Sequence, residues 1–442
     1  MPLHSNSSAA LLKSHIPITV NQILKDLKEA GHRGFIVGGA VRDAHMQRPM
    51  TDWDVATSAT PEEIKSLFRD RKYFALKHGT VTLVSSEGHF EVTTFRGRDK
   101  SLGGDLAHRD FTINAMAIDP DTNEILDPHG GKGDIDRKLV RAVVNPEARF
   151  KEDPIRLLRA VRFATELGFQ IERQTLKGLI NLSSLMNSVA PERVREELMR
   201  LLMSPKPSAG FYLMVRTGLL SHVLPELYEG YLKRQNPSQR YTIFRHTVET
   251  VDMVEPVPVL RLAALFHDIA KPRVREKIGG KWYFYGHEEA SAGLAEEIML
   301  RLRFSKEVIR KTTNLVRHHT IYYDSGWSDG AVRRLICRVG QEAIRDLISF
   351  LRADILAHGL HKKQLPLLPE LEERVTREIE TRLVTDIGDL AINGRKVMEV
   401  LGLSPGSEVG RVLQYLMEEV TDHPELNNQK GLFGLLGHIK GD

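Results

Sequence analysis

The spacing of apolar positions changes along the chain, from short mixed segments near the N-terminus to helical spacing farther on. Residues 35–37 form a short apolar run that ends at Gly38 and Gly39, which predicts a buried strand entering a tight turn. Residues 80–85 and 89–95 alternate between apolar and polar side chains around a three-residue gap, which predicts a hairpin. We therefore expect a small mixed α/β unit over residues 30–145.

Beyond residue 155 the pattern is helical. In the first such segment, apolar side chains recur at helical spacing at Leu157, Leu158, Val161, Ala164 and Leu167. Gly168 follows them and predicts the end of that helix. The predicted fold class is α+β, a small mixed α/β head followed by a long helical part.

The composition is that of a globular protein and narrows the function classes. The 442 residues suggest about three domains. Hydrophobic residues at 41% and charged residues at 27% exclude a disordered chain or a collagen-like fibre. No run approaches the roughly 20 apolar residues of a membrane span, so we expect no membrane partner. The single cysteine, Cys337, agrees with a cytoplasmic location. The net charge of +4 permits a polyanionic partner without requiring one.

The most informative stretch of the head contains two aspartates two positions apart. Asp52 and Asp54 would share one face of a strand and present two carboxylates there. Such a pair suits Mg²⁺, which usually shares its coordination with substrate phosphates. The preceding glycine pair lets backbone N–H groups approach an anion, and Arg42 adds a positive charge. This combination favours phosphoryl or nucleotidyl transfer, whereas an isolated Asp-x-Asp is more often a solvated strand end.

These residues also resemble the first signature of class II tRNA nucleotidyltransferases and their poly(A) polymerase relatives. Four further segments resemble the later motifs of that family, in the family's order: residues 109–117, 127–134, 152–163 and 191–193. The resemblance implies Mg²⁺ at Asp52 and Asp54. Glu91, on the strand before the short segment of residues 97–104, is a candidate third carboxylate, and an exposed strand glutamate is the alternative. It implies nucleotide contacts at Gly38, Gly39, Arg42, Arg109, Asp110, Asn114, Asp153, Arg156, Arg159 and Arg162.

The resemblance implies that the fourth motif, residues 152–163, selects the base of the nucleotide. Asp153 and Arg156 are three positions apart, which predicts that they share one helix face. A carboxylate beside a guanidinium can pair with the edge of cytosine or adenine but not with that of uracil or guanine. A surface salt bridge between the two side chains is the commoner fate of such a pair.

Members of the family that add adenosine carry a sizeable flexible loop between the last hairpin strand of the head and the second motif. Here only residues 97–104 separate them, which favours a CC-adding enzyme. Harmless trimming of a surface loop is the alternative. The second motif also departs from the family pattern at His108, where an arginine is usual.

The helical part contains a series of histidines and aspartates that resembles an HD phosphohydrolase domain. The predicted ligands are His246, His267, Asp268, His287, His318 and Asp354. Imidazoles with carboxylates suit Mn, Ni, Co, Fe or Zn. The resemblance implies phosphatase or cyclic phosphodiesterase activity, and the alternative is a domain that only supplies bulk and an RNA-binding surface.

Together the motifs imply a tRNA 3′-end nucleotidyltransferase that adds CMP from CTP to tRNA lacking its CCA end and releases pyrophosphate. A CC-adding enzyme requires a separate A-adding enzyme. Three alternatives stay open: a full CCA-adding enzyme that also uses ATP, a poly(A) polymerase, and a phosphohydrolase with an inactive head. The expected segments are a head at 17–145, a helical neck at 146–205, an HD body at 206–365 and a helical tail at 366–442.

Overall fold

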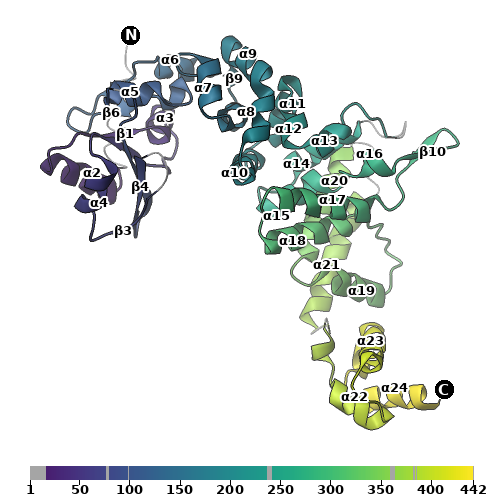
Figure 1. Cartoon of the computed structure of the whole chain (residues 1–442). Helices are drawn as coiled ribbons and strands as arrows, with labels where there is room; N and C mark the ends of the chain where they lie inside the picture. Colours follow the sequence, from purple (N-terminus) through teal and green to yellow (C-terminus); the bar gives the residue numbers. More distant parts are fainter. Residues whose placement is uncertain are drawn as a thin grey trace. The chain divides into compact units, whose positions relative to one another are not determined.

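The computed structural model describes residues 16–75, 79–97, 99–235, 241–358, 364–381, 384 and 386–441. The chain forms two compact units (Figure 1). The first comprises Met1–Leu201 with Ala209–Val223, and the second comprises Leu202–Ser208 with Leu224–Asp442. The finer division into head, neck, body and tail stays a prediction.

The first unit is built on a seven-stranded sheet with the order β3-β4-β5-β2-β1-β6-β7. The strands are β1 (Gly34–Val37), β2 (Asp54–Thr57), β3 (Lys72–Ala75), β4 (Thr80–Ser85), β5 (Gly88–Thr94), β6 (Ala117–Ile118) and β7 (Ile125–Leu126). Only β2 and β5 run parallel among these neighbours. The register pairs Val37 with Asp54 and Asp54 with Glu91. The end of β1 and both carboxylates therefore lie side by side on three adjacent strands.

Helices surround this sheet and continue the unit beyond it. They are α2 (Ile18–Glu29), α3 (Gly39–His45), α4 (Pro61–Leu67), α5 (Leu102–Ala107), α6 (Gly131–Asp136), α7 (Pro146–Glu152), α8 (Ile155–Leu167), α9 (Arg173–Leu182), α10 (Pro191–Leu202), α11 (Pro207–Thr217) and α12 (Leu220–Val223). Helix α8 ends at Gly168 in the left-handed conformation, as the sequence predicts. Strands β8 (Leu139–Val140) and β9 (Gln170–Ile171) pair in parallel.

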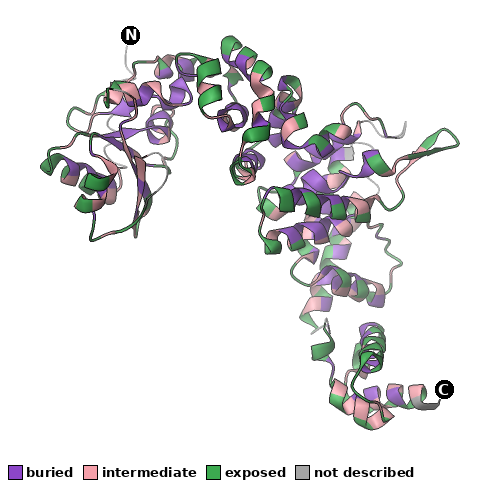
Figure 2. Cartoon of the chain, in the orientation of Figure 1, coloured by how far each residue is buried: buried purple, intermediate pink, exposed green. Residues whose placement is uncertain are grey.

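The second unit is mainly helical. Its helices are α13 (Pro225–Glu229), α14 (Ile243–Met253), α15 (Pro258–Phe266), α16 (Lys271–Val274), α17 (His287–Arg301), α18 (Lys306–Arg317), α19 (Asp329–Val339), α20 (Ile344–His358), α21 (Leu368–Glu380), α22 (Gly394–Leu401), α23 (Ser407–Asp422) and α24 (Gln429–Gly441). Figure 2 shows buried residues on the sides where neighbouring helices of this unit meet. Residues 260–266 of α15 are all buried, so this helix lies at the centre of the unit.

The predicted fold class is confirmed, since the head is mixed α/β and the rest is mostly helical. The predicted hairpin is β4 and β5. Helical periodicity did not predict the hairpin of β10 (Glu276–Ile278) and β11 (Lys281–Tyr283) in the second unit. In the described part of the chain, no helix is long and apolar enough to span a membrane.

Candidate active site and candidate metal centre

The turn after β1 requires a glycine. Gly38 has a φ of 80°, a conformation that residues with side chains rarely adopt. A Cβ at this position would lie 2.8 Å from Nη1 of Arg109 and 3.2 Å from Oδ2 of Asp54. The absent side chain therefore allows a predicted nucleotide-binding arginine and a predicted metal-binding carboxylate to approach the same point of the backbone.

The three carboxylates of the head lie near the start of β2, in the middle of the sheet. Asp54 is the first residue of β2, whereas Asp52 precedes the strand, so the expectation that both lie within it is wrong. Asp52 and Glu91 are exposed, and Asp54 is partly buried. Burial raises the pKa of the Asp54 carboxyl to about 6; Arg109 opposes this shift, and Glu91 and Asp52 add to it. This concentration of negative charge favours binding of a divalent cation.

A buried aspartate that the sequence analysis missed holds Arg109 in place. Asp105 is fully buried on α5 and forms ion pairs with Arg96, at 2.8 Å, and with Arg109, at 3.3 Å. Burial alone would raise the pKa of Asp105, but the two arginines outweigh it and hold the pKa below its usual range. An acidic residue four positions before Arg109 was the available signal.

The short segment between β5 and α5 is compact. Ser101 caps α5 by accepting a hydrogen bond from the backbone N–H of Gly104, at 3.0 Å. A Cβ on Gly104 would lie 2.2 Å from Oδ1 of Asp99 and 3.1 Å from the carbonyl oxygen of Arg96. The ion pair between Arg96 and Asp105 then joins the two ends of the segment. This tight turn stands where adenosine-adding members would carry a flexible loop.

Arg42 is buried rather than open to solvent. Its guanidinium donates two hydrogen bonds to Asp43, both at 2.9 Å, and one to Oδ1 of Asn114, at 2.8 Å. The amide of Asn114 in turn donates to Asp110, at 3.2 Å. Asp110 also pairs with Arg159, at 3.2 Å. The predicted nucleotide-binding residues of the first, second and fourth motifs thus form one connected network.

Asp153 and Arg156 do not share a helix face, and that expectation is wrong. Asp153 terminates α7 in an extended conformation, while Arg156 lies in the first turn of α8. The alternative, a salt bridge between the two side chains, is not observed either. Arg193 of α10 binds both carboxylate oxygens of Asp153, each at 2.8 Å. Arg156 binds Glu152 at 2.6 Å and the carbonyl oxygen of His108 at 2.9 Å.

Arg159 and Arg162 converge on a second acidic residue that the sequence analysis missed. Glu197 of α10 accepts from Nε of Arg159, at 3.0 Å, and from Nε of Arg162, at 2.5 Å. Arg162 is only 3% exposed and also pairs with Glu166. Arg159, in contrast, reaches Asp110 as well. The ion pairs of Arg162 are therefore structural, and those of Arg159 link α10 to the network of the head.

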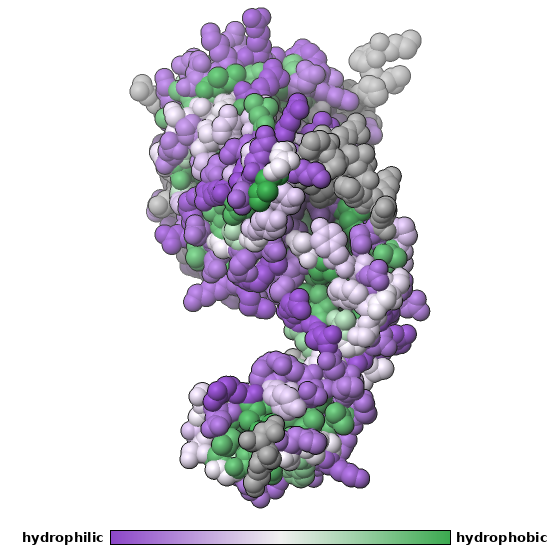
Figure 3. All heavy atoms as spheres, turned by 90° about the vertical axis from the view of Figure 1, so that its right-hand side faces the viewer, coloured by the Kyte–Doolittle hydropathy of each residue, from purple (hydrophilic) through white to green (hydrophobic). Residues whose placement is uncertain are grey.

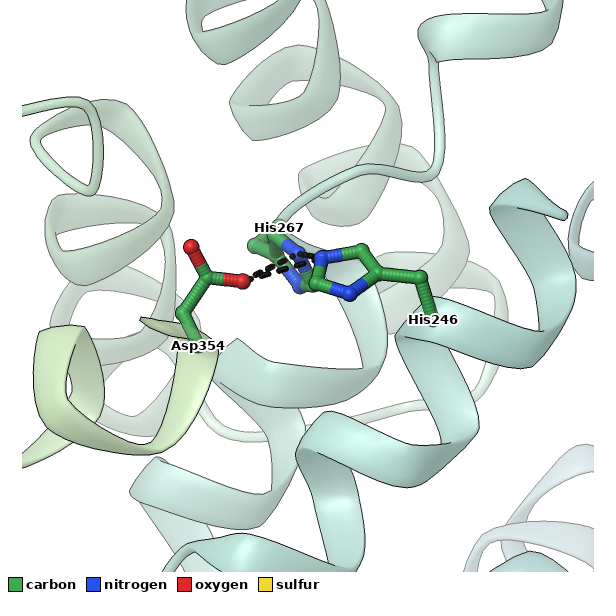
Figure 4. Close-up of side chains that lie close together, drawn as sticks. All are labelled: His246, His267 and Asp354. Atoms are coloured by element: carbon green, nitrogen blue, oxygen red, sulfur yellow. Dashed lines mark hydrogen bonds and ion pairs between the residues drawn. The ribbon is translucent and has the colours of Figure 1, made fainter. Parts of the chain in front are cut away.

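The second unit assembles a compact group of histidines and carboxylates. His246 of α14, His267 after α15 and Asp354 of α20 form one set whose ligand atoms all lie within 4.8 Å of one another (Figure 4). Nε2 of His246 lies 3.1 Å from Nε2 of His267 and 2.9 Å from Oδ1 of Asp354. Asp268, His287 and His319 form a second set within the same limit.

His318 is a wrong prediction, because its neighbour His319 occupies the cluster. His318 is the residue at which α18 ends, and its half-buried ring lies near Arg317, Arg338 and Glu289. His319 is 5% exposed, and its Nε2 lies 3.6 Å from Oδ1 of Asp268. Adjacent residues at a helix end point in different directions, so only one of the two rings can enter the core.

Backbone carbonyls orient three of the imidazoles. Nδ1 of His267, His287 and His319 donates to the carbonyl oxygens of Ala264, Phe284 and Val316, at 2.9, 2.8 and 2.7 Å respectively. This leaves each Nε2 facing the cluster, the arrangement typical of histidine ligands. Among the described residues, Oδ1 of Asp268 is buried without a hydrogen-bond partner, although it lies 3.5 Å from His287. The donor set therefore fits a bound cation.

The charges of the cluster compensate one another. Burial alone would lower the pKa of His267, but the carboxylates of Asp268 and Asp354 outweigh it and raise the pKa to about 10. Burial would likewise raise the pKa of Asp268, but His267 and Lys271 hold it well below its usual range. Lys271 donates to Oδ2 of Asp268 at 2.7 Å. The two oxygens of Asp268 thus face different partners. Oδ2 faces Lys271 and the histidines of the first set, whereas Oδ1 faces the histidines of its own set.

Comparison with known protein families matches three regions of the chain. A family described as "Poly A polymerase head domain" matches residues 34–141, and "Probable RNA and SrmB- binding site of polymerase A" matches residues 168–229. "HD domain" matches residues 243–356. The CCA-adding enzyme of Streptococcus thermophilus is 30% identical over 433 residues, which cover 95% of this chain and 96% of that protein. The chain belongs to the class II tRNA nucleotidyltransferase family.

Relatives of two kinds occur within this family. A CC-adding tRNA nucleotidyltransferase of Halalkalibacterium halodurans is 45% identical over 197 residues, 45% of this chain and 52% of that protein. The crystal structure of the Bacillus stearothermophilus CCA-adding enzyme in complex with CTP matches 95% of this chain and 96% of that one, with a TM-score of 0.72 and 26% identity. The predicted family and the assignment as a nucleotidyltransferase are confirmed, whereas sequence identity does not separate the CC-adding from the CCA-adding tRNA nucleotidyltransferases.

Proposed function

We propose that this tRNA nucleotidyltransferase is a CC-adding enzyme, which transfers two CMP residues from CTP to tRNA lacking its CCA end and leaves the terminal adenosine to a separate A-adding enzyme. The observation that carries this proposal is the short segment of residues 97–104, of which the structure describes all but residue 98. The cap by Ser101 and the ion pair between Arg96 and Asp105 tether it at both ends. We expect that a segment so short and tethered at both ends does not move enough to change the base pocket from one that binds cytosine to one that binds adenine.

In the proposed reaction Asp52 and Asp54 would hold Mg²⁺, which would supply Lewis acidity toward the RNA 3′-hydroxyl and neutralise the charge of the triphosphate. Gly38 and Gly39 let the triphosphate approach the backbone. Arg42 stabilises this turn through its hydrogen bonds to Asp43 and Asn114. Arg109, held by Asp105, and Asp110 contact the sugar. Arg193 holds Asp153, and Glu152 holds Arg156, in position to read the base edge.

The test is nucleotide addition to a tRNA transcript that ends at the discriminator base. CTP alone, ATP alone and both together are supplied with Mg²⁺, and the products are resolved to one nucleotide. We expect addition to stop after two cytidines even when ATP is present. Completion to CCA would overturn the proposal in favour of a full CCA-adding enzyme, and long adenosine tails would indicate a poly(A) polymerase.

A loop-exchange variant tests the stated cause. Residues 97–104 are replaced by a longer, flexible segment, and the wild-type protein serves as the control. We expect the variant to keep CMP addition and to gain measurable AMP addition. Unchanged products from a variant that still adds CMP would show that the length of this segment does not determine the choice of base.

We further propose that the cluster of the second unit binds a divalent transition metal and hydrolyses phosphate esters. Its support is the set of six ligands and the oriented Nε2 atoms of His267, His287 and His319. Asp268 lies near both sets, with Oδ2 3.3 Å from Nε2 of His267 and Oδ1 3.5 Å from Nε2 of His287, so its carboxylate would help to hold a metal. Such a metal supplies Lewis acidity and an activated water. Metal content by mass spectrometry, together with hydrolysis of p-nitrophenyl phosphate, tests this proposal.

A further inference from the structure

The hairpin of β10 and β11 lies between two ligands of the candidate metal centre. The arm, defined here as residues 275–285, follows α16, whose Lys271 contacts Asp268, and leads through Gly286 into His287. In Figure 1 it projects from the helices around it, and Figure 2 shows most of it exposed. Gly279 and Gly280, both with positive φ, form its tip, and a Cβ on either would extend into open space.

The arm carries basic side chains up to the start of its second strand and a run of aromatic side chains at residues 282–285. Arg275, Lys277 and Lys281 are basic, and Glu276 is its single acidic residue. In the described part of the chain, none of the three basic side chains forms an ion pair with a carboxylate. Figure 3 shows the molecule from the side toward which the arm projects in Figure 1, and much of that face is hydrophilic. The arm is therefore a positively charged surface.

The aromatic rings of the arm are arranged for stacking. The guanidinium of Arg275 lies 3.6 Å from the ring centroid of Trp282, and the ammonium of Lys277 lies 5.7 Å from it. Tyr283 and Tyr285 are stacked, with centroids 5.4 Å apart and planes 11° apart. Tyr285 remains 68% exposed, so the outer face of this stack is open to a further ring. Nucleobases stack on such exposed tyrosines and on guanidinium planes.

The base of the arm meets the accessible side of the metal centre. The side chains of His287 and Asp354 are 13% and 16% exposed, whereas those of the other four ligands are at most 5% exposed. Tyr285 is two residues before His287, and the carbonyl oxygen of Phe284 orients the His287 ring. A nucleotide stacked on Tyr285 would therefore place its phosphate beside the open side of the cluster.

We propose that the arm binds single-stranded RNA, with bases stacked on Tyr285 and phosphates on Lys277 and Lys281, and presents a terminal phosphate of that RNA to the metal centre. The presentation rests on the proposed hydrolase function, whereas the binding does not. In the hydrolysis, water adds its oxygen to phosphorus and the ester P–O bond breaks. The products are an RNA 3′-hydroxyl and inorganic phosphate.

The experiment measures binding of a fluorescent single-stranded RNA decamer with a 3′-phosphate to the full-length protein. We expect Tyr285→Ala to raise the Kd about tenfold, because one stacked base is lost. Tyr285→Phe, which keeps the ring, should bind like the wild type. Replacing Lys277 and Lys281 by Gln should reduce the slope of log binding constant against log salt concentration by about 1.4. This is the loss of two phosphate contacts, each worth about 0.7 for single-stranded RNA. Tyr415→Ala, in α23, is the matched control for an exposed tyrosine elsewhere.

Cross-linking separates the arm from the RNA-binding surfaces of the head. Decamers that contain 4-thiouridine should cross-link to residues 275–285 of the wild type and lose that cross-link in the Tyr285→Ala variant. An unchanged Kd in this variant, or cross-links confined to the first unit, would overturn the inference.

Hydrolysis separates the inference from the proposed hydrolase. Tyr285→Ala should slow hydrolysis of the RNA 3′-phosphate about tenfold and leave p-nitrophenyl phosphate unaffected, since that substrate has no base to stack. If the wild type hydrolyses neither substrate, the hydrolase proposal fails, while arm-dependent RNA binding would still stand. Equal slowing of both substrates would overturn the presentation step.

Discussion

The head and the second unit both gather carboxylates suited to a divalent cation, but they complete the site to different degrees. In the head, Asp52 and Glu91 are exposed and Asp54 is partly buried. Among the described residues, sets of three ligand atoms within 4.8 Å occur only around Asp268, in the second unit. We infer that the head relies on the substrate's phosphates to complete the coordination, whereas the second unit supplies all its ligands from the chain.

The electrostatic balance of the two sites differs in the same way. Burial raises the pKa of Asp54 to about 6, Glu91 and Asp52 raise it further, and the nearby arginines only partly oppose them. Around Asp268, the charges of His267 and Lys271 overcome burial and lower the pKa. The head thus carries negative charge that a cation must neutralise, while the second unit is already compensated. The two sites should therefore respond differently to mutation, chelation and pH.

The largest expected effect is a reciprocal loss of two activities. Asp54→Asn should lower CMP addition by about a thousandfold, equal to about 4 kcal/mol of transition-state stabilisation, and leave p-nitrophenyl phosphate hydrolysis unchanged. His267→Ala should do the reverse. Both activities are measured on each purified variant, with exposed Glu124→Gln as the control. Loss of both activities in either variant, without unfolding, would show that the two sites are not independent.

Adjacent histidines allow a sharp test of the metal centre. His319→Gln should abolish hydrolysis and reduce the bound transition metal, whereas His318→Gln should retain both. Chelation should lower the melting temperature of the wild type and of His318→Gln by several degrees, because a ligand that binds only the folded state stabilises it. It should have a smaller effect on His319→Gln. Metal analysis and thermal melting check these results, and equal behaviour of the two variants would contradict the assignment.

A smaller effect is expected at Asp105, which positions Arg109 without lying among the metal-binding carboxylates. Asp105→Asn should slow CMP addition by about ten- to a hundredfold and lower the stability of the head, since two arginines lose a buried charged partner. Steady-state kinetics should show a change in KM for CTP as well as in kcat. Glu124→Gln, exposed elsewhere in the head, is the control and should change neither constant by more than about twofold.

The smallest expected effect is the pH dependence of the head. Below pH 6 the Asp54 carboxyl is protonated, so CMP addition at low Mg²⁺ should fall up to tenfold per pH unit. A higher Mg²⁺ concentration should move this acidic fall in rate to lower pH, because the cation favours the ionised carboxylate. The folded state holds this proton more tightly than the unfolded chain, so the contribution of Asp54 to stability decreases as pH rises from about 4 to about 6. Rate profiles at two Mg²⁺ concentrations check the prediction, and an acidic fall in rate that is insensitive to Mg²⁺ would contradict it.

The pattern of the sequence predicted the elements whose signals are local. The β4–β5 hairpin alternates along two strands of ordinary length, and α8 has a continuous apolar stripe ended by Gly168. Strands β6 and β7 have two residues each, too few to display a period. The β10–β11 hairpin is exposed and carries charged residues on both faces, so it lacks the apolar alternation of a packed strand.

The sequence by itself determined the family, the order of its motifs and the residue types that carry the chemistry. Tertiary structure decided which of two adjacent histidines enters the cluster, and that Asp153 pairs with Arg193 rather than with Arg156. It also decided that Asp105 and Glu197 are buried between arginines. Periodicity along a chain reports the face that a residue occupies on its own element. The partner of a charged side chain depends instead on which distant elements pack against that face, because burial of a charge is stable only where opposite charges meet it.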